Sequence, residues 1–276
     1  MSADLPVWPT TKAILEYCWQ ERRLALRYAA VPVALLIAMD SVGTAAGVDI
    51  AEDKVWTFAA SIVALLVFMP TMVTWYYGVV FGHEEARRRP IFTFGRREGA
   101  VLGTNILVAI VIGLSLIPLA ALVALVAGPV GYVVSEFAGQ VTAVVLGIPA
   151  VFVWLMILTR LSVVIAYAAA GEHLGLKDAW RITKPFGVQI TWMHVILGCI
   201  GMGISTAATA LVSEGMELAG LGNGDGPAPA IDLAVSVTDA LFGVIYLVLT
   251  TTLFGVVYRK IGPLQTAEGQ TAEPKI

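Results

Sequence analysis

The chain has 276 residues, of which 58% are hydrophobic and 13% are charged; its formal net charge is −3 and its mean hydropathy is +0.83. A soluble domain carries about 25% charged residues, so this composition excludes a soluble domain, a disordered chain and a basic nucleic-acid-binding protein. It predicts an all-α integral membrane protein with a single transmembrane domain over residues 1–262 and a flexible cytoplasmic tail over 263–276.

The N-terminal segment, about residues 10–23, is predicted to form an amphipathic helix that lies along the membrane surface. Ile14, Leu15, Cys18 and Trp19 fall on one side of such a helix. Lysine, glutamate and arginine residues fall mainly on the other side, as in helices that lie in the plane of the interface.

Six apolar runs follow, each long enough to cross a hydrocarbon core that requires about 20 helical residues. Barrel strands would alternate between apolar and polar residues over about ten positions, whereas these runs are uniformly apolar. We therefore expect six transmembrane helices. They are approximately Leu24–Val42, Val55–Val80, Ala100–Ala127, Val141–Ala170, Gln189–Val212 and Ile231–Val257.

The distribution of basic residues predicts the orientation of these helices. Fifteen of the 17 Lys and Arg residues fall in the N-terminal segment, the second and fourth loops, and the C-terminal tail. The first, third and fifth loops together contain only Lys54. Basic residues are enriched in cytoplasmic loops, so both termini are expected on the cytoplasmic side.

The cytoplasmic loops contain a group of basic residues that we call the basic rim. Its members could bind the phosphates of anionic lipids or an acidic partner protein. As signals that anchor and orient the helices, they are also fully explained without any ligand. The eight residues are Arg87, Arg88, Arg89, Arg96, Arg97, Lys177, Arg181 and Lys184.

The segment from Leu176 to Lys184 is predicted to form a second, shorter interfacial amphipathic helix. Leu176, Ala179 and Trp180 would face lipid, and its charged residues would face water. His83 and Glu84 begin like a zinc-binding HExxH motif, but Arg87 stands where the second histidine is needed. We expect no metal ion or other cofactor.

Three ionisable residues lie within the predicted spans: Asp40, Arg160 and Asp239. Such residues are candidates for function because burying a charge in a bilayer is costly. Segment counting places Asp40 and Asp239 toward the outer side, where they could form a proton or cation site. It places Arg160 near the inner boundary, where we expect an ion pair with Glu98 or contact with lipid phosphate.

Several short motifs resemble a group of uncharacterised six-helix membrane proteins found mainly in alphaproteobacteria. These motifs are Trp75-Tyr76-Tyr77, Phe94-Gly95-Arg96-Arg97-Glu98, Arg160-Leu161-Ser162 and the segment Leu176–Lys184. The chain is more distantly similar to the membrane domain of glycerophosphodiester phosphodiesterases and to YciC-type proteins. The resemblance implies the six-helix architecture and a bacterial inner-membrane location. It does not imply the phosphodiesterase activity, because the catalytic barrel is not part of this chain.

The sequence favours a non-catalytic membrane protein that acts through the basic rim as a scaffold, a lipid-interacting factor or an accessory subunit. It contains no nucleophile, zinc or phosphate-loop motif of an enzyme. The expected partners are anionic membrane lipids, a protein partner or a second copy of the chain, and no nucleic acid. The alternative is a small transporter or channel that uses Asp40 and Asp239.

Overall fold

The computed structural model describes residues 5–45, 54–88, 93–218 and 229–271. Helices are the only regular secondary structure in these residues. Their order is α1 (Val7–Gln20), α2 (Arg22–Ala45), α3 (Lys54–Phe81), α4 (His83–Arg87), α5 (Arg96–Val133), α6 (Glu136–Ala170), α7 (Leu176–Thr183), the 3₁₀ turn η1 (Lys184–Phe186), α8 (Gly187–Leu218) and α9 (Pro229–Thr271).

Six of these helices are long and apolar enough to cross a membrane, as the sequence predicts. They are α2, α3, α5, α6, α8 and α9, and each contains one of the six predicted runs. The structure thus has the architecture of a multi-pass membrane protein. The α9 helix continues to Thr271, so it extends into the segment predicted as a flexible tail.

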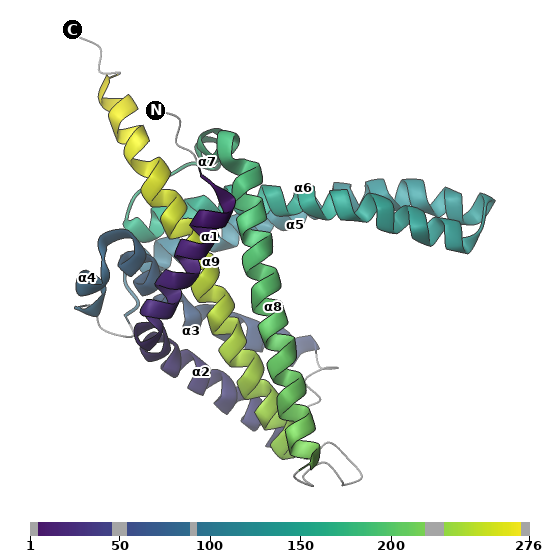
Figure 1. Ribbon diagram of the computed structural model, residues 1–276, viewed down its shortest axis with the longest axis horizontal. Helices are drawn as coiled ribbons and strands as arrows, with labels where there is room; N and C mark the ends of the chain where they lie inside the picture. Colours follow the sequence, from purple (N-terminus) through teal and green to yellow (C-terminus); the bar gives the residue numbers. More distant parts are fainter. Residues whose placement is uncertain (1–4, 46–53, 89–92, 219–228, 272–276) are drawn as a thin grey trace.

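The N-terminal amphipathic helix begins earlier than predicted, at Val7, and ends at Gln20. Pro9 lies within its first turn, where the missing amide hydrogen costs no helical hydrogen bond. A turn at Glu21 then separates α1 from α2. The helix packs across α8 and α9, so much of its apolar side contacts protein (Figure 1).

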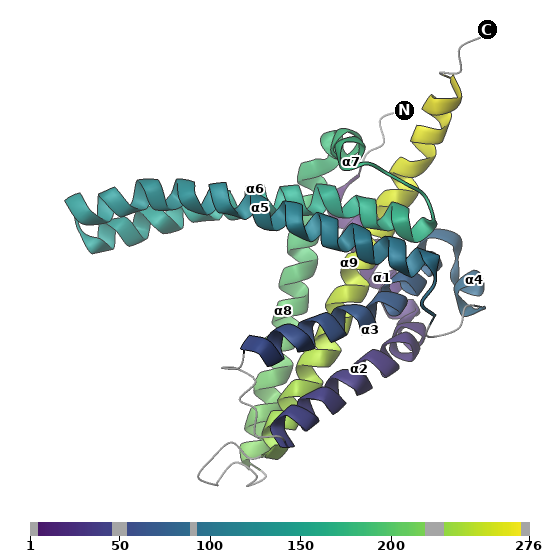
Figure 2. The ribbon, with the colours of Figure 1, turned by 180° about the vertical axis from the view of Figure 1, so that it is seen from behind.

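The six long helices do not form one parallel bundle. Helices α5 and α6 lie side by side as an antiparallel hairpin that projects away from the other helices (Figures 1 and 2). Helices α8 and α9 form a second pair, and α2 and α3 pack against α9. The helices converge near α1, so that the hairpin and the remaining helices spread apart from a common junction.

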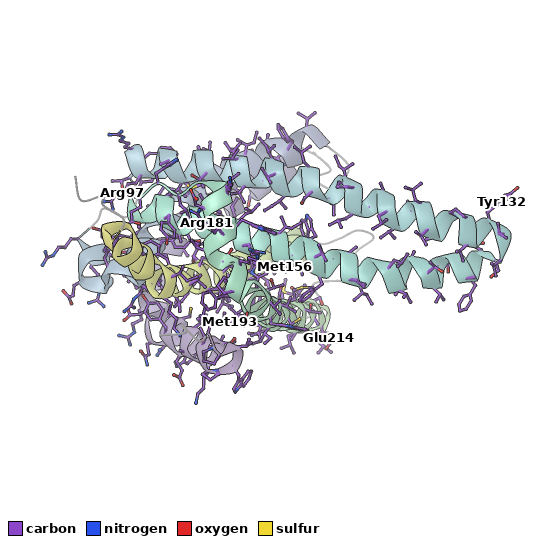
Figure 3. The ribbon with its side chains drawn as sticks, turned by 90° about the horizontal axis from the view of Figure 1, so that it is seen from above. Arg97, Tyr132, Met156, Arg181, Met193 and Glu214 are labelled. Carbon is purple, nitrogen blue, oxygen red and sulfur yellow. The ribbon has the colours of Figure 1, made fainter. Side chains whose placement is uncertain are left out.

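The turn of the hairpin is short and is fixed by a helix cap. The Ser135 hydroxyl accepts a hydrogen bond of 3.1 Å from the amide of Ala138, which is the usual role of serine before a first helical turn. Next to this turn, Gly131 and Gly139 bring the two backbones close together. Tyr132 lies at the tip and is 94% exposed (Figure 3). The exposed apolar side chains of the hairpin suit contact with lipid.

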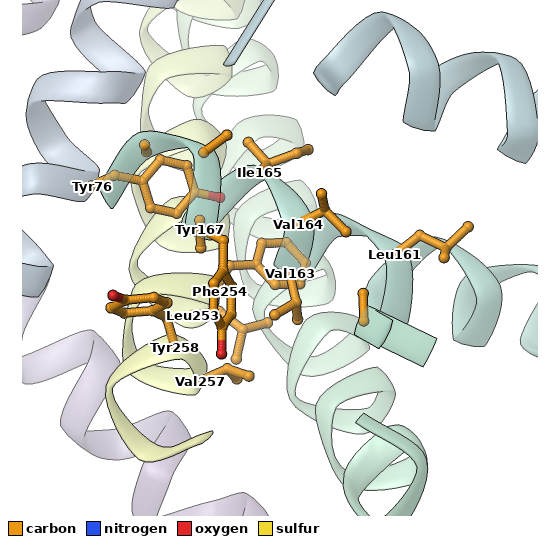
Figure 4. Packing of buried hydrophobic residues seen from close by; sticks show 14 of the residues in the cluster. Tyr76, Leu161, Val163, Val164, Ile165, Tyr167, Leu253, Phe254, Val257 and Tyr258 are labelled. Carbon is orange, nitrogen blue, oxygen red and sulfur yellow. The ribbon is translucent and has the colours of Figure 1, made fainter. Parts of the chain in front are cut away.

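The core lies at the junction, around the C-terminal part of α6. Every residue from Thr159 to Ala170 is buried, so this part of the helix is enclosed on all its faces. Tyr76 of α3 and Phe254 of α9 pack against it (Figure 4). An apolar helix that is buried all round must be surrounded by other helices, and α3, α7, α8 and α9 all pack against α6.

A short chain of polar contacts joins α1, α3 and α9. The indole nitrogen of Trp75 donates to the Thr252 hydroxyl at 2.8 Å, and that hydroxyl donates to the Val248 carbonyl at 2.6 Å. The Cys18 sulfur lies 3.3 Å from the same hydroxyl. Burial raises the pKa of the Cys18 thiol to about 11. The Thr252 hydroxyl already donates its one hydrogen to Val248, so the thiol is the donor in this contact.

Candidate functional site

The first part of the basic rim surrounds α4 and the start of α5. Arg87 ends α4, Arg88 follows it, and Arg96 begins α5; all three side chains are exposed. Arg97 is half-buried and lies over the ring of Tyr77, with 5.1 Å between the guanidinium carbon and the ring centre. Arg89 lies outside the described residues. This part of the rim therefore presents three exposed cations beside one arginine held against the protein.

The second part of the basic rim lies on α7 and η1. Lys177, Arg181 and Lys184 are exposed, whereas Ala179 and Thr183 are buried against the protein. This amphipathic division follows from the spacing of the residues along one short helix. The structure differs from the prediction at two residues: Ala179 is buried and Leu176 is half-buried against the core, so both contact protein, because α7 packs on α6.

Arg181 has a carboxylate partner within the same helix. Its guanidinium lies 2.7 Å from the Asp178 carboxylate, three residues earlier. Exposed pairs of this kind contribute about 0.3–0.5 kcal/mol and are weakened by salt. Arg181 is therefore partly neutralised, and Lys177 and Lys184 are the more available cations of α7 and η1.

Arg160 lies beneath α7 and is only 5% exposed. Its Nε donates to the Thr183 hydroxyl at 3.2 Å, and its Nη2 donates to the Trp180 carbonyl. The guanidinium carbon also lies 3.6 Å from the centre of the Trp180 ring, which is cation–π geometry. The residue predicted near the inner boundary thus holds α7 against α6.

The ion pair of Arg160 with Glu98 stays a prediction. Glu98 is buried at the start of α5, where its carboxylate accepts a 2.9 Å hydrogen bond from the Gly95 amide. This contact caps the first turn of α5, and a negative charge is favourable at a helix N-terminus. Within the described residues, the polar contacts of Arg160 are with neutral groups of α7.

The side chains of Asp40 and Asp239 lie outside what the structure describes. Their backbones belong to α2 and α9, and these two helices pack against each other. A shared proton or cation site therefore stays a prediction. Among the described residues, no three His, Cys, Asp or Glu side chains come together as metal ligands would.

Two further polar contacts link residues that are far apart in the sequence. The Tyr258 hydroxyl donates to the Glu172 carboxylate at 2.8 Å, and the ring of Tyr258 packs edge-on to that of Tyr167. Buried His194 lies with its Nε2 3.2 Å from the Tyr246 hydroxyl. The sequence did not predict these contacts. The first pair is 86 positions apart and the second is 52, and no motif or spacing links residues at such distances.

Comparisons with protein-family models, curated proteins and solved structures found no match for this chain.

Proposed function

We propose that this chain is a non-catalytic, multi-pass membrane protein that binds anionic lipids or an acidic partner through its basic rim. It would act as a scaffold, a lipid-interacting factor or an accessory subunit of the bacterial inner membrane. The observation that carries the proposal is the exposure of Arg87, Arg88, Arg96, Lys177 and Lys184 around two short helices. Each basic residue near an anionic membrane surface contributes about 1 kcal/mol to binding.

The manner in which α7 is held supports this proposal. Buried Ala179 and the contacts of Arg160 fix the helix to α6, so its basic residues are presented on a rigid support. The backbone of α7 therefore does not have to become ordered when a ligand binds. Preorganisation of this kind favours affinity.

The proposal requires both termini and the basic rim to lie in the cytoplasm. Reporter fusions at Gly47, Gly131 and Gly222 should all report the external side, because the loops between basic segments are expected there. A fusion after Lys260 should report the cytoplasm. A cytoplasmic signal at Gly131 would contradict the six-helix topology, because this residue lies beside the turn of the α5–α6 hairpin.

The basic rim is tested by replacing Arg87, Arg88 and Arg96 together with glutamine in the full-length protein. Three lost contacts of about 1 kcal/mol each predict an affinity for anionic lipid about 100-fold lower at low salt. The measurement is retention of phosphatidylglycerol over phosphatidylcholine by the purified protein. High salt should reduce the retention by wild type in the same way.

The matched control replaces the same three residues with lysine, which keeps the charge and should retain most of the binding. Topology reporters on the glutamine variant separate lost binding from altered orientation. If that variant keeps its lipids and partners, while Asp40→Asn or Asp239→Asn abolishes ion-coupled uptake, the transporter hypothesis replaces the proposal.

A further inference from the structure

We infer that Arg160, together with the junction of α7, η1 and α8, binds the phosphate group of an anionic lipid. This inference deepens the proposed function, on which it rests, by assigning one specific site and one ligand chemistry. It concerns a buried residue at the junction of three helices rather than the exposed basic rim.

The first step is that Arg160 is a buried cation whose partners in the described part of the chain are neutral. A guanidinium has five N–H donors. In this structure the Nε and Nη2 atoms donate to a hydroxyl and a carbonyl of α7. The Thr183 hydroxyl in turn donates to the Ala179 carbonyl at 2.6 Å, so it carries no negative charge. The positive charge of Arg160 therefore has no protein counter-charge among these contacts.

The second step is that part of the guanidinium is still available. Nη1 has no protein acceptor in the described residues, and it is not among their fully enclosed unpartnered atoms. The Trp180 ring covers one face of the guanidinium, which leaves its edge for in-plane hydrogen bonds. Phosphate oxygens are suited to this edge, because a guanidinium donates parallel hydrogen bonds to them.

The third step concerns the surroundings, which favour a lipid. The backbone of α8 begins against Arg160, since a methyl group on Gly187 would lie 3.0 Å from the Arg160 Cδ. Val188, which directly follows Gly187, and Trp192, about one turn later, are both exposed, and Trp180 is itself 39% exposed. A phosphate at Arg160 would thus lie beside exposed apolar side chains, as the headgroup of a lipid does.

The position of Arg160 in the fold agrees with this assignment. Arg160 lies on the part of α6 against which both α7 and α8 pack. Lys184 directly follows Thr183, a hydrogen-bond partner of Arg160, and its side chain is exposed. A second cation therefore lies close along the chain, and lysine also binds phosphate.

The test uses the purified full-length protein, stripped of lipid in detergent, and native mass spectrometry. We expect wild type to bind one phosphatidic acid or phosphatidylglycerol molecule tightly and to retain it at high salt. Diacylglycerol, which lacks the phosphate, should bind at least about tenfold more weakly. In a separate experiment, inorganic phosphate or glycerol phosphate is added as a competitor. Competition by either at low concentration would identify a soluble phosphate, rather than a lipid, as the ligand and would overturn the lipid assignment.

The variant Arg160→Gln should bind the tight lipid about tenfold more weakly or worse. Arg160→Lys should lose most of this affinity, because lysine lacks the planar guanidinium. Arg22→Gln is the matched control. Arg22 also lies over a tryptophan ring, that of Trp19, and donates to its carbonyl, but it is exposed. This control should keep the tight lipid.

The two proposals fail in different ways. Loss of the basic rim should remove only the additional, salt-sensitive lipids, whereas loss of Arg160 should remove only the single salt-resistant one. If Arg160→Gln does not fold, the preference of wild type for phosphatidic acid over diacylglycerol decides the question. Equal binding of those two lipids by wild type, or an unchanged tight lipid in a folded Arg160→Gln variant, would overturn the inference.

Discussion

The variant Gly255→Ala is expected to lower the free energy of unfolding by about 1–3 kcal/mol. A methyl group on Gly255 would lie 2.6 Å from the Val79 Cγ1 and 3.0 Å from the Val79 Cβ, so α3 and α9 would have to separate. The gain in helix propensity from glycine to alanine, about 1 kcal/mol, offsets part of this loss. Thermal unfolding in detergent is the measurement.

The control for this prediction is Gly243→Ala on the same helix. Nothing lies within 4 Å of a methyl group placed there, so this change should leave the stability equal or slightly higher. Equal melting temperatures for the two variants would contradict the close approach of α3 to α9.

The variant Trp75→Leu should destabilise the protein by about 3 kcal/mol, because it removes a large aromatic side chain from the core. Trp75 is 2% exposed, packs edge-on against Tyr17 and donates to Thr252, and thereby joins α1, α3 and α9. Trp75→Phe keeps an aromatic ring but loses the hydrogen bond to Thr252. The lost hydrogen bond should lower the free energy of unfolding by about 1 kcal/mol, in addition to the effect of the smaller ring.

Trp8 supplies the comparison, since it is 66% exposed. Trp8→Leu should change the stability by less than about 0.5 kcal/mol. The same thermal measurement distinguishes these outcomes. A Trp75→Leu variant as stable as Trp8→Leu would show that α1 does not dock on α3 and α9 as described.

The existence of the six long helices could be predicted because it depends on the length of apolar runs, which is a local property. The ends of these helices could be predicted less well. The run predicted as Ala100–Ala127 belongs to a helix that extends from Arg96 to Val133. Helical hydrogen bonding continues past the apolar run at both ends, where the sequence becomes more polar or contains small residues.

The arrangement of the helices could not be predicted. Helices α5 and α6 are apolar on nearly every side, so the sequence contains no stripe that identifies the packed face. The same apolar pattern is found in the part of α6 next to the hairpin turn, whose residues are mostly exposed or half-buried, and in its C-terminal part, which is enclosed. Only the tertiary fold distinguishes these two environments.

The candidate site was predicted in its composition but not in its contacts. Charge patterning identified the exposed cations of α4, α7 and η1. Counting along the helix predicted the depth of Arg160. Its partners, the Thr183 hydroxyl and the Trp180 carbonyl, are neutral groups that no charge pattern reveals. Their proximity depends on where α7 docks.

The enclosure of the C-terminal part of α6 has a consequence for biosynthesis. The α5–α6 hairpin has its own turn and its own interface, so it can enter the bilayer as a unit while the ribosome is still translating. Leu161 to Ala170, however, are covered in part by α8 and α9, which are made later. A nascent chain that stops before Ala240 lacks the α9 side of this enclosure. The junction is therefore complete only after α9 has been made, and chains truncated before that point should be less stable than the full chain.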